Sequence, residues 1–379
     1  MEFNKNVTSL KFSGIANVIE KANKVGDQVI RLEVGDVDLP TSDLIKNSVS
    51  EAMMKDKTHY PPLRGDSLLL NKLSKEMTLE LEKAIDIEEI LITAGGSIGM
   101  YLAFATLLSA GDEVVVIDPI WPHLIEMIKS VGATPVIVSA KETENFHLDL
   151  SEIESNISSK TKAILINTPN NPTGVIYNEN EIKELCKMAS KFGIYIISDE
   201  EYCDYYYDNN FVSPLKFYDK VFISRSFSKK YSIAGLRLGF VVSNKELMDV
   251  VIKLSLFTTM YPSSIMQYAL SNVNEEVKDF TSNARNIMNK RMEILYEGFN
   301  SIPKLSCPKS EGGLYVWLKC KDIDEDDVAF ADRLLYKAFV ATVPGSCFGD
   351  SGKGYLRVSL GATKEKLIEA INRISGELK

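Results

Sequence analysis

The sequence predicts an α/β protein in which a mostly parallel, seven-stranded sheet carries helices on both faces and a smaller α+β domain is attached. Between about residues 90 and 245, apolar runs of strand length alternate with longer helical patterns, which is typical of βαβ units. After residue 245 the pattern changes to long amphipathic helices with short strands between them. A chain of 379 residues also exceeds the length at which single hydrophobic cores usually divide. We therefore expect two domains.

Most of the apolar runs are continuous rather than alternating, as expected for strands that are covered on both faces. The predicted strands of the large sheet are residues 90–93, 114–117, 135–138, 163–166, 194–197, 221–223 and 238–242. The second domain should contain a helix in the charged stretch from about 274 to 299 and short strands around 314–317 and 355–358.

Charge and composition restrict the class of partner. The formal net charge is −9 and the sequence pI is about 5.2, so the chain lacks the basic excess that attracts nucleic acid or an anionic membrane. The sequence has neither an apolar signal core near its start nor an apolar run of the ~20 residues that span a bilayer. Five cysteines without CxxC spacing indicate free thiols, and three histidines without ligand spacing predict no metal site. We expect a cytoplasmic protein that acts on small molecules.

The segment from residue 226 to 239 combines hydroxyls, an amine and a guanidinium directly after a predicted strand. Lys229 can form a Schiff base with an aldehyde, while Ser226, Ser228 and Arg237 offer donors and positive charge for a phosphate. The loop would leave the carboxyl end of a parallel strand, where ligands bind in open α/β sheets. The sequence therefore predicts a site for a phosphorylated aldehyde cofactor, pyridoxal 5′-phosphate (PLP).

Four further segments accompany this one along the chain. They are residues 93–97 (TAGGS), 170–174 (NNPTG), 199–202 (DEEY) and 354–359 (GYLRVS). With these motifs the chain resembles, over nearly its whole length, the class I/II aminotransferases, the aspartate aminotransferase-like group of fold-type-I PLP-dependent enzymes. A single tetrapeptide can arise by chance, but five segments in the family's order are hard to produce otherwise.

The resemblance implies a division of the chain as well as a fold. In this family the N-terminal segment packs with the C-terminal domain. We therefore expect residues 42–280 to form the large cofactor-binding α/β domain, and residues 1–41 together with 281–379 to form a discontinuous small α+β domain.

Two adjacent lysines compete for the role of the nucleophilic amine. In the family this lysine lies eight residues before the phosphate-binding arginine, and Lys229 is eight residues before Arg237, whereas Lys230 is one residue off. After substrate displaces it, Lys229 would move a proton between the substrate Cα and the cofactor. In the alternative interpretation, both lysines are surface charges on a loop, and the serines and glycines that flank them disfavour it.

The other cofactor contacts are also implied by the resemblance. Asp199 would pair with the pyridine nitrogen and keep it protonated; its alternative role is a helix cap. Tyr202 and Asn171 would donate hydrogen bonds to the phenolic oxygen. Trp121 occupies the position of an aromatic that stacks on the ring, with an ordinary core residue as the alternative.

The phosphate contacts are expected to come from two loops of one subunit and from a second subunit. Gly95, Gly96 and Ser97 end a strand and open a helix, whose N-terminus favours an anion. They would act together with the serines and arginine of the 226–239 segment. Tyr60 resembles the tyrosine that the family contributes to the phosphate of the neighbouring subunit, which implies a homodimer.

The substrate carboxylate is expected at the C-terminal motif. Arg357 offers a planar fork that matches a carboxylate in two hydrogen bonds, and Gly35 resembles the glycine whose backbone lies beside the same group. Asn171 would contribute to the same subsite. Distal pocket residues that select the side chain are not predicted.

The resulting hypothesis is a PLP-dependent aminotransferase that moves the amino group of an L-amino acid to a 2-oxo acid by a ping-pong mechanism. Acidic, aromatic and aliphatic donors all stay open, and the resemblance favours aspartate or an aromatic amino acid. A PLP-dependent C–S lyase or another carbanion-forming enzyme of the same fold is an alternative, because the same residues serve all these reactions. A non-catalytic domain that senses PLP or an amino acid is a third alternative, which the full set of catalytic residue types disfavours.

Overall fold

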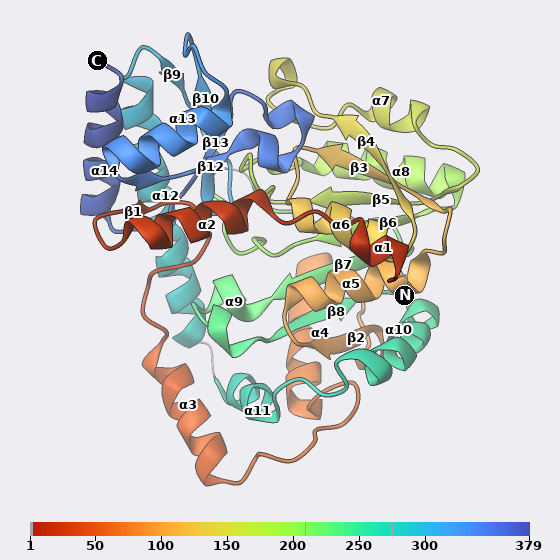
Figure 1. The fold of residues 1–379 in the computed structure, drawn as a ribbon. Coiled ribbons are helices and arrows are strands. Elements are labelled where there is room, and N and C mark those ends of the chain that lie inside the picture. The colour runs from red at the N-terminus through yellow and green to blue at the C-terminus, as the bar shows by residue number, and fades with distance from the viewer. Residues whose placement is uncertain (1–2, 209, 274–275) are drawn as a thin grey trace.

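The computed structural model describes residues 3–208, 210–273 and 276–379 (Figure 1). Its largest sheet has seven strands in the order β2-β8-β7-β6-β5-β3-β4, and β8 runs in the direction opposite to the other six. All seven predicted strands are confirmed. Their bounds are β2 Ile90–Thr93, β3 Glu113–Asp118, β4 Thr134–Ser139, β5 Thr161–Asn167, β6 Tyr195–Asp199, β7 Val221–Ser226 and β8 Gly239–Val242.

Helices cover both faces of this sheet because successive strand residues point to opposite sides. Val114 and Val116 of β3 pack in one buried cluster with α5, α6 and α10. Val115 and Ile117 pack in another cluster with α3, α4, α8 and α11. The bounds are α3 Asp43–Met54, α4 Ser67–Leu81, α5 Gly96–Leu107, α6 Pro122–Ser130, α7 Leu150–Ser155, α8 Glu179–Phe192, α10 Lys245–Thr258 and α11 Ser264–Asn272.

The C-terminal part forms a second, antiparallel sheet with the strand order β12-β13-β10-β9. Both short strands predicted there are confirmed, as β10 and β13. The predicted charged helix is α12, although residues 274–275 of that prediction lie outside the described residues. The bounds are β9 Leu305–Ser306, β10 Tyr315–Cys320, β12 Val343–Pro344, β13 Tyr355–Ser359, α12 Glu276–Asn300, α13 Asp327–Arg333 and α14 Lys364–Glu377.

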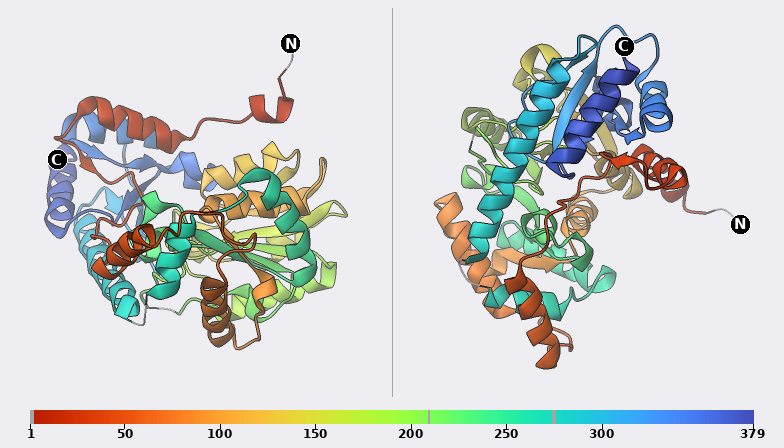
Figure 2. Two further views of the ribbon diagram at one scale, coloured as in Figure 1. Left: turned by 90° about the horizontal axis from the view of Figure 1, so that it is seen from below. Right: turned by 90° about the vertical axis from the view of Figure 1, so that its left-hand side faces the viewer.

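The start of the chain lies against this C-terminal part. β1 (Ile30–Arg31) pairs in parallel with β11 (Val340–Ala341), and Leu32 and Val37 pack in the same buried cluster as α12 and α14. Figure 2 shows α2 (Gly14–Val25) beside the blue C-terminal elements, while α1 (Lys5–Thr8) lies next to α6. This arrangement agrees with a discontinuous second domain, but the division at residues 42 and 280 stays a prediction.

The strand directions bring the predicted motifs together. Because β2, β3, β5, β6 and β7 point the same way, their carboxyl ends share one edge of the sheet. β7 continues at that edge into the short helix α9 (Phe227–Lys230), and β2 leads into α5. Within the described residues, no helix combines the length and the apolar character that crossing a bilayer requires.

Candidate active site

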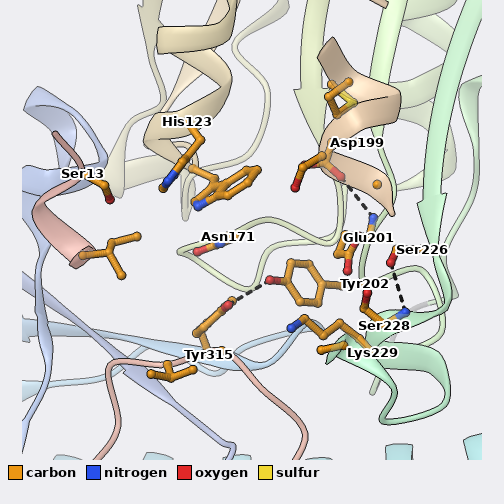
Figure 3. Close-up of a pocket in the computed structure, with 18 of the residues that line it drawn as sticks. Ser13, His123, Asn171, Asp199, Glu201, Tyr202, Ser226, Ser228, Lys229 and Tyr315 are labelled. Carbon is orange, nitrogen blue, oxygen red and sulfur yellow. Dashed lines mark hydrogen bonds between the residues drawn. The ribbon is translucent and has the colours of Figure 1, made fainter. Parts of the chain in front are cut away.

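A cavity of about 320 Å³ lies at this edge of the sheet (Figure 3). It is bordered by the ends of the strands, by α9 and by segments from both ends of the chain. Most of the predicted site residues line it. They are Gly35, Gly96, Ser97, Trp121, Asn171, Asp199, Tyr202, Ser226, Ser228, Lys229, Arg237 and Arg357.

The two adjacent lysines of α9 face different cavities. Lys229 lines the cavity described above, with its Nζ 3.6 Å from Asp36 Oδ1, and its backbone oxygen accepts a hydrogen bond from Tyr205 Oη. Lys230 lines a separate cavity of about 300 Å³, where its Nζ lies 3.5 Å from Asp204 Oδ1. Only Lys229 therefore presents its amine to the space shared by the other predicted residues.

Donors for an anion gather at one end of the cavity. Ser226 Oγ accepts a hydrogen bond from the backbone N–H of Ser228 at 3.0 Å, which fixes the Ser226 side chain at the start of α9. Gly95 adopts φ +96° as the N-cap of α5, and a Cβ built on it would lie 2.5 Å from Arg237 Nη2. The absence of a side chain at Gly95 thus lets the Arg237 guanidinium approach the N-terminus of α5. We name the serines, Arg237 and the Gly96–Ser97 turn the anion cradle.

Asp199 is a buried acid without a cationic partner among the described residues. It ends β6, is 8% exposed, and its Oδ1 accepts a hydrogen bond from the backbone N–H of Glu201 at 3.3 Å. Burial, assisted by the nearby negative charge of Glu201, raises the pKa of Asp199 to about 8. A cation placed beside this carboxyl would reverse that shift.

Tyr202 and Tyr315 form the wall between the two sheets. Their hydroxyl oxygens lie 2.8 Å apart and their rings meet edge to face at 81°. The Arg357 guanidinium lies over the Tyr315 ring, 4.2 Å from its centre. A Cβ on Gly35 would lie 1.7 Å from Tyr315 Oη, so only glycine fits at that position without a shift of Tyr315.

Arg357 is buried, yet part of its hydrogen-bonding capacity is left over. Nη1 donates to Asn171 Oδ1 at 2.9 Å and Nη2 donates to the backbone oxygen of Glu33 at 2.6 Å. Its Nε has no hydrogen-bond partner within the described part of the chain. A guanidinium carries five N–H donors, and the bonds to Asn171 and Glu33 use two of them, so N–H groups on Nη1 and Nη2 are left to pair with an acceptor in the cavity that Arg357 lines.

Trp121 lies at the cavity wall and stacks on His123, with ring centres 4.4 Å apart and an angle of 24° between the planes. Burial lowers the pKa of His123, which favours its neutral form. Trp121 is therefore a partly buried cavity residue and not an ordinary core residue.

Comparison with known proteins decides between the families that could build such a cavity. The family model for aminotransferases of class I and II matches residues 27–374. The chain belongs to the class I and II aminotransferase family.

The chain is 35% identical to a probable aspartate/prephenate aminotransferase of Aquifex aeolicus, and the alignment covers 98% of each chain. It is 34% identical to an aspartate aminotransferase of Pyrococcus horikoshii, covering 98% of this chain and 96% of the relative. A solved structure of the Thermus thermophilus aspartate aminotransferase with maleate superimposes with a TM-score of 0.95 at 29% identity over 100% of both chains. The protein is thus a PLP-dependent aminotransferase of fold type I.

The residues of this aminotransferase fit its cofactor. A phosphate requires several donors, which the anion cradle provides, and the buried acid Asp199 lacks the cation that a protonated ring nitrogen would supply. The amine of Lys229 lies in the same cavity. PLP therefore matches the chemistry at both ends of the cavity, phosphate at one and ring nitrogen at the other.

Two predicted residues do not line the cavity of their own chain: Gly95, which lies behind Arg237 at the N-terminus of α5, and Tyr60. Tyr60 is 82% exposed, and its ring centre lies 4.9 Å from that of Tyr261. This position is compatible with the predicted role in a neighbouring subunit, which stays a prediction.

Sequence analysis also left out several residues that line the cavity. Tyr315 lay in a predicted strand and gave no motif signal of its own, and Glu201 was hidden inside the DEEY motif. Ser13, Ile15 and Ile19 come from the N-terminal arm, and only their positions in the folded chain bring them here. The motif offers two acids between Asp199 and Tyr202, Glu200 and Glu201, and the sequence does not show which of them lines the cavity.

Proposed function

We propose that this aminotransferase transfers the amino group of an L-amino acid to a 2-oxo acid by a ping-pong cycle in which Lys229 supplies the amine that bonds to the cofactor aldehyde. The observation that carries the proposal is the position of Lys229 in one cavity with Asp199 and Arg357, while Lys230 faces a different cavity. When bound, PLP supplies an aldehyde that takes up the amino group and a ring that withdraws electrons from the substrate Cα.

Each side chain has a defined task in this proposal. Arg357 binds the substrate α-carboxylate through the Nη N–H groups that are not used in the bonds to Asn171 and Glu33, and those two bonds hold the plane of its guanidinium fixed. This clamp presents the Cα–H bond to Lys229, which takes the proton as general base and returns it at the next step. Asp199 holds the ring nitrogen in its protonated form through its negative charge.

The remaining residues position the cofactor. Asn171 uses its amide oxygen on Arg357, so its NH₂ group is left to donate to the phenolic oxygen of the cofactor together with Tyr202 Oη. Trp121 provides an aromatic face for the ring, and the anion cradle binds the phosphate. Tyr60 of a second copy completes the phosphate site, so the active form is a homodimer in the cytoplasm.

Two donor classes have support. The relatives named as aspartate and aspartate/prephenate aminotransferases support L-aspartate. An aromatic L-amino acid is supported by the apolar side of the cavity, which is lined by Ile15, Ile19, Val34 and Trp121. Initial rates measured with each class of amino donor, with 2-oxoglutarate as the acceptor, show which class the enzyme prefers.

Replacement of the amine tests the proposal. Lys229→Ala should lower kcat by at least about 10⁴-fold and abolish the absorbance change that accompanies attachment of PLP to the protein. Lys230→Arg is the matched control, because it keeps a cation in the other cavity and should retain most of the turnover. Retained turnover in Lys229→Ala, or its loss only in the Lys230 variant, would contradict the proposal.

A single-turnover experiment separates transamination from lyase chemistry. The PLP-loaded enzyme mixed with amino acid alone should release one 2-oxo acid per site and then stop, with the nitrogen retained on the cofactor. Continued release of pyruvate and ammonia would identify a lyase instead.

A further inference from the structure

The carboxylate of Glu201 lies within the anion cradle. Glu201 follows β6 and lines the same cavity as Ser226, Lys229 and Arg237. A Cβ built on Gly96 would lie 2.7 Å from its Oε2, so the carboxylate rests against the first residue of α5. Figure 3 shows Glu201 between Asp199 and Ser226. A negatively charged side chain thus occupies a place where the fold has gathered donors for an anion.

Glu201 engages the donors that the phosphate needs. Ser226 and Glu201 both lie beside Gly96, because a Cβ on this glycine would lie 2.7 Å from Glu201 Oε2 and 3.4 Å from Ser226 Cβ. The positive charges of Lys229 and Arg237 and the hydroxyl of Ser226 oppose the effect of burial on the pKa of Glu201. From the same segment, Asp199 accepts a hydrogen bond from the backbone N–H of Glu201. Burial and then the negative charge of Glu201 raise the pKa of Asp199, and burial, Tyr315 and Glu201 raise the pKa of Tyr202. The residues of α5 at this position, Gly96 and Ser97, carry no charge but present the N-terminus of the helix.

Entry of a phosphate places a second negative charge beside the carboxylate of Glu201. A phosphate dianion and an ionised carboxylate that share one set of donors repel each other, and the partly buried site screens that repulsion weakly. A protonated Glu201 removes the repulsion and provides one more O–H donor to a phosphate oxygen. Burial already raises the pKa of Glu201 to about 7, so near neutral pH the proton comes from solvent at little cost.

We propose that Glu201 is a cofactor-binding acid that takes up one proton from solvent when the phosphate of PLP enters the cradle, so that cofactor loading weakens as the pH rises above neutral. The inference rests on the proposed use of the cradle for the PLP phosphate. The sign follows from linkage: the anion raises the pKa of Glu201 in the complex, so affinity is greatest below the pKa of the free form and falls above it.

The test compares wild type with Glu201→Gln, which mimics the protonated acid in shape and charge. The cofactor-free proteins are titrated with PLP from pH 6 to pH 8.5, with bound cofactor followed by absorbance. Taking the ratio of the two Kd values at each pH removes the pH dependence that both proteins share, including that of PLP itself. The wild-type to Gln ratio should be near 1 at pH 6 and rise to about 30 at pH 8.5, about tenfold per pH unit above neutral.

Sulfate is a second probe, because it stays a dianion throughout this pH range and forms no bond to lysine. Its ability to raise the melting temperature of the cofactor-free wild type should decline between pH 6 and pH 8.5 and should stay constant in Glu201→Gln. Glu184→Gln on the exposed side of α8, where Glu184 pairs with Lys187, controls for the change in net charge and should behave as wild type.

The inference and the proposed function fail in different ways. A Kd ratio that stays constant with pH, while PLP binds to both proteins, would overturn the role of Glu201 and leave the aminotransferase proposal intact. A weaker affinity of Glu201→Gln at all pH values would likewise overturn it, because the ionised form would then assist binding. Failure of wild type to bind PLP at any pH would instead contradict the proposed function.

Discussion

Arg357 donates a hydrogen bond from Nη1 to the amide oxygen of Asn171 over 2.9 Å, and this contact joins the C-terminal strand β13 to the loop after β5. The two residues are 186 positions apart in sequence. The bond orients both groups: it fixes the plane of the guanidinium, and it leaves the NH₂ of Asn171 free to act as a donor. Substrate and cofactor contacts are thus coupled through one side-chain pair.

The fork geometry of Arg357 predicts the result of a charge-conserving change. Arg357→Lys keeps the positive charge but loses the planar pair of donors and the bonds that hold it, so kcat/KM for amino donors should fall by about 10²–10³-fold, mainly through KM. The Kd of PLP should change much less. Arg373→Lys, which affects a surface pair with Glu369, should leave the kinetics unchanged. Comparable kcat/KM values in wild type and Arg357→Lys would exclude Arg357 as the carboxylate site.

Gly95 and Gly26 provide a matched pair of substitutions. Both have positive φ, +96° and +94°, with ψ near 180°, a region that is essentially restricted to glycine, so alanine strains each backbone by about 1–3 kcal/mol. A Cβ on Gly26 meets open space, whereas one on Gly95 would collide with Arg237. Both variants should therefore lose similar stability, but only Gly95→Ala should raise the Kd of PLP, by about 10–100-fold, which is the range for hydrogen bonds to charged groups. Titration of the two variants with PLP measures the difference, and equal Kd values would remove Arg237 from the phosphate site.

The sequence was sufficient for the large sheet because most of its strands are continuous apolar runs buried on both faces; the edge strand β4, with Ile137 43% exposed, is the exception. It also located the residues that directly follow those strands, such as Asn171 and Lys229, since parallel strands deliver their carboxyl ends to a common edge. Cavity residues whose position depends on tertiary packing were missed. Tyr315 faces the cavity because β10 pairs with β13, and Ile15 reaches it from a distant segment. No local pattern encodes either contact.

Glu201 illustrates a second limit of sequence reasoning. The DEEY motif predicted Asp199 and Tyr202 as cofactor contacts, and the structure places both at the cavity. The same motif carried no information on where the side chain between them would point. Its direction is set by the turn after β6 and by the space that Gly96 leaves at the start of α5.

The exposure of Tyr60 predicts that the site requires a second copy of the chain. The protein should sediment as a homodimer, and Tyr60→Phe should raise the Kd of PLP by about tenfold through the loss of one hydrogen bond to a charged group. Tyr336→Phe, at another partly exposed tyrosine, should have no effect. A fully active monomer, or an unchanged Kd in Tyr60→Phe, would show that the cavity is complete within one chain.

Asp199 should make the cofactor-free enzyme less stable as the pH rises. Its pKa is about 8 in the folded chain and about 4 in an unfolded one, so the folded state binds the extra proton between these values. The stability that this group contributes is complete below about pH 4 and is lost as the pH rises through the folded-state pKa. Asparagine at this position cannot ionise, so the Asp199→Asn variant does not lose this stability as the pH rises. Without cofactor, the variant should exceed wild type at pH 8.5 by on the order of 1–5 kcal/mol in the free energy of unfolding, with a smaller difference at pH 5.

Urea unfolding at the two pH values measures this difference, with the exposed Asp324→Asn as control for net charge. Addition of PLP should make wild type more stable than Asp199→Asn, because the protonated ring nitrogen stabilises the ionised Asp199 and makes no comparable interaction with asparagine. The variant should also lose most of its turnover, since the ring nitrogen is no longer held in its protonated form. A cofactor-free Asp199→Asn protein that is less stable than wild type at pH 8.5 would show that the acid is accommodated by its surroundings and does not depend on a cation from the cofactor.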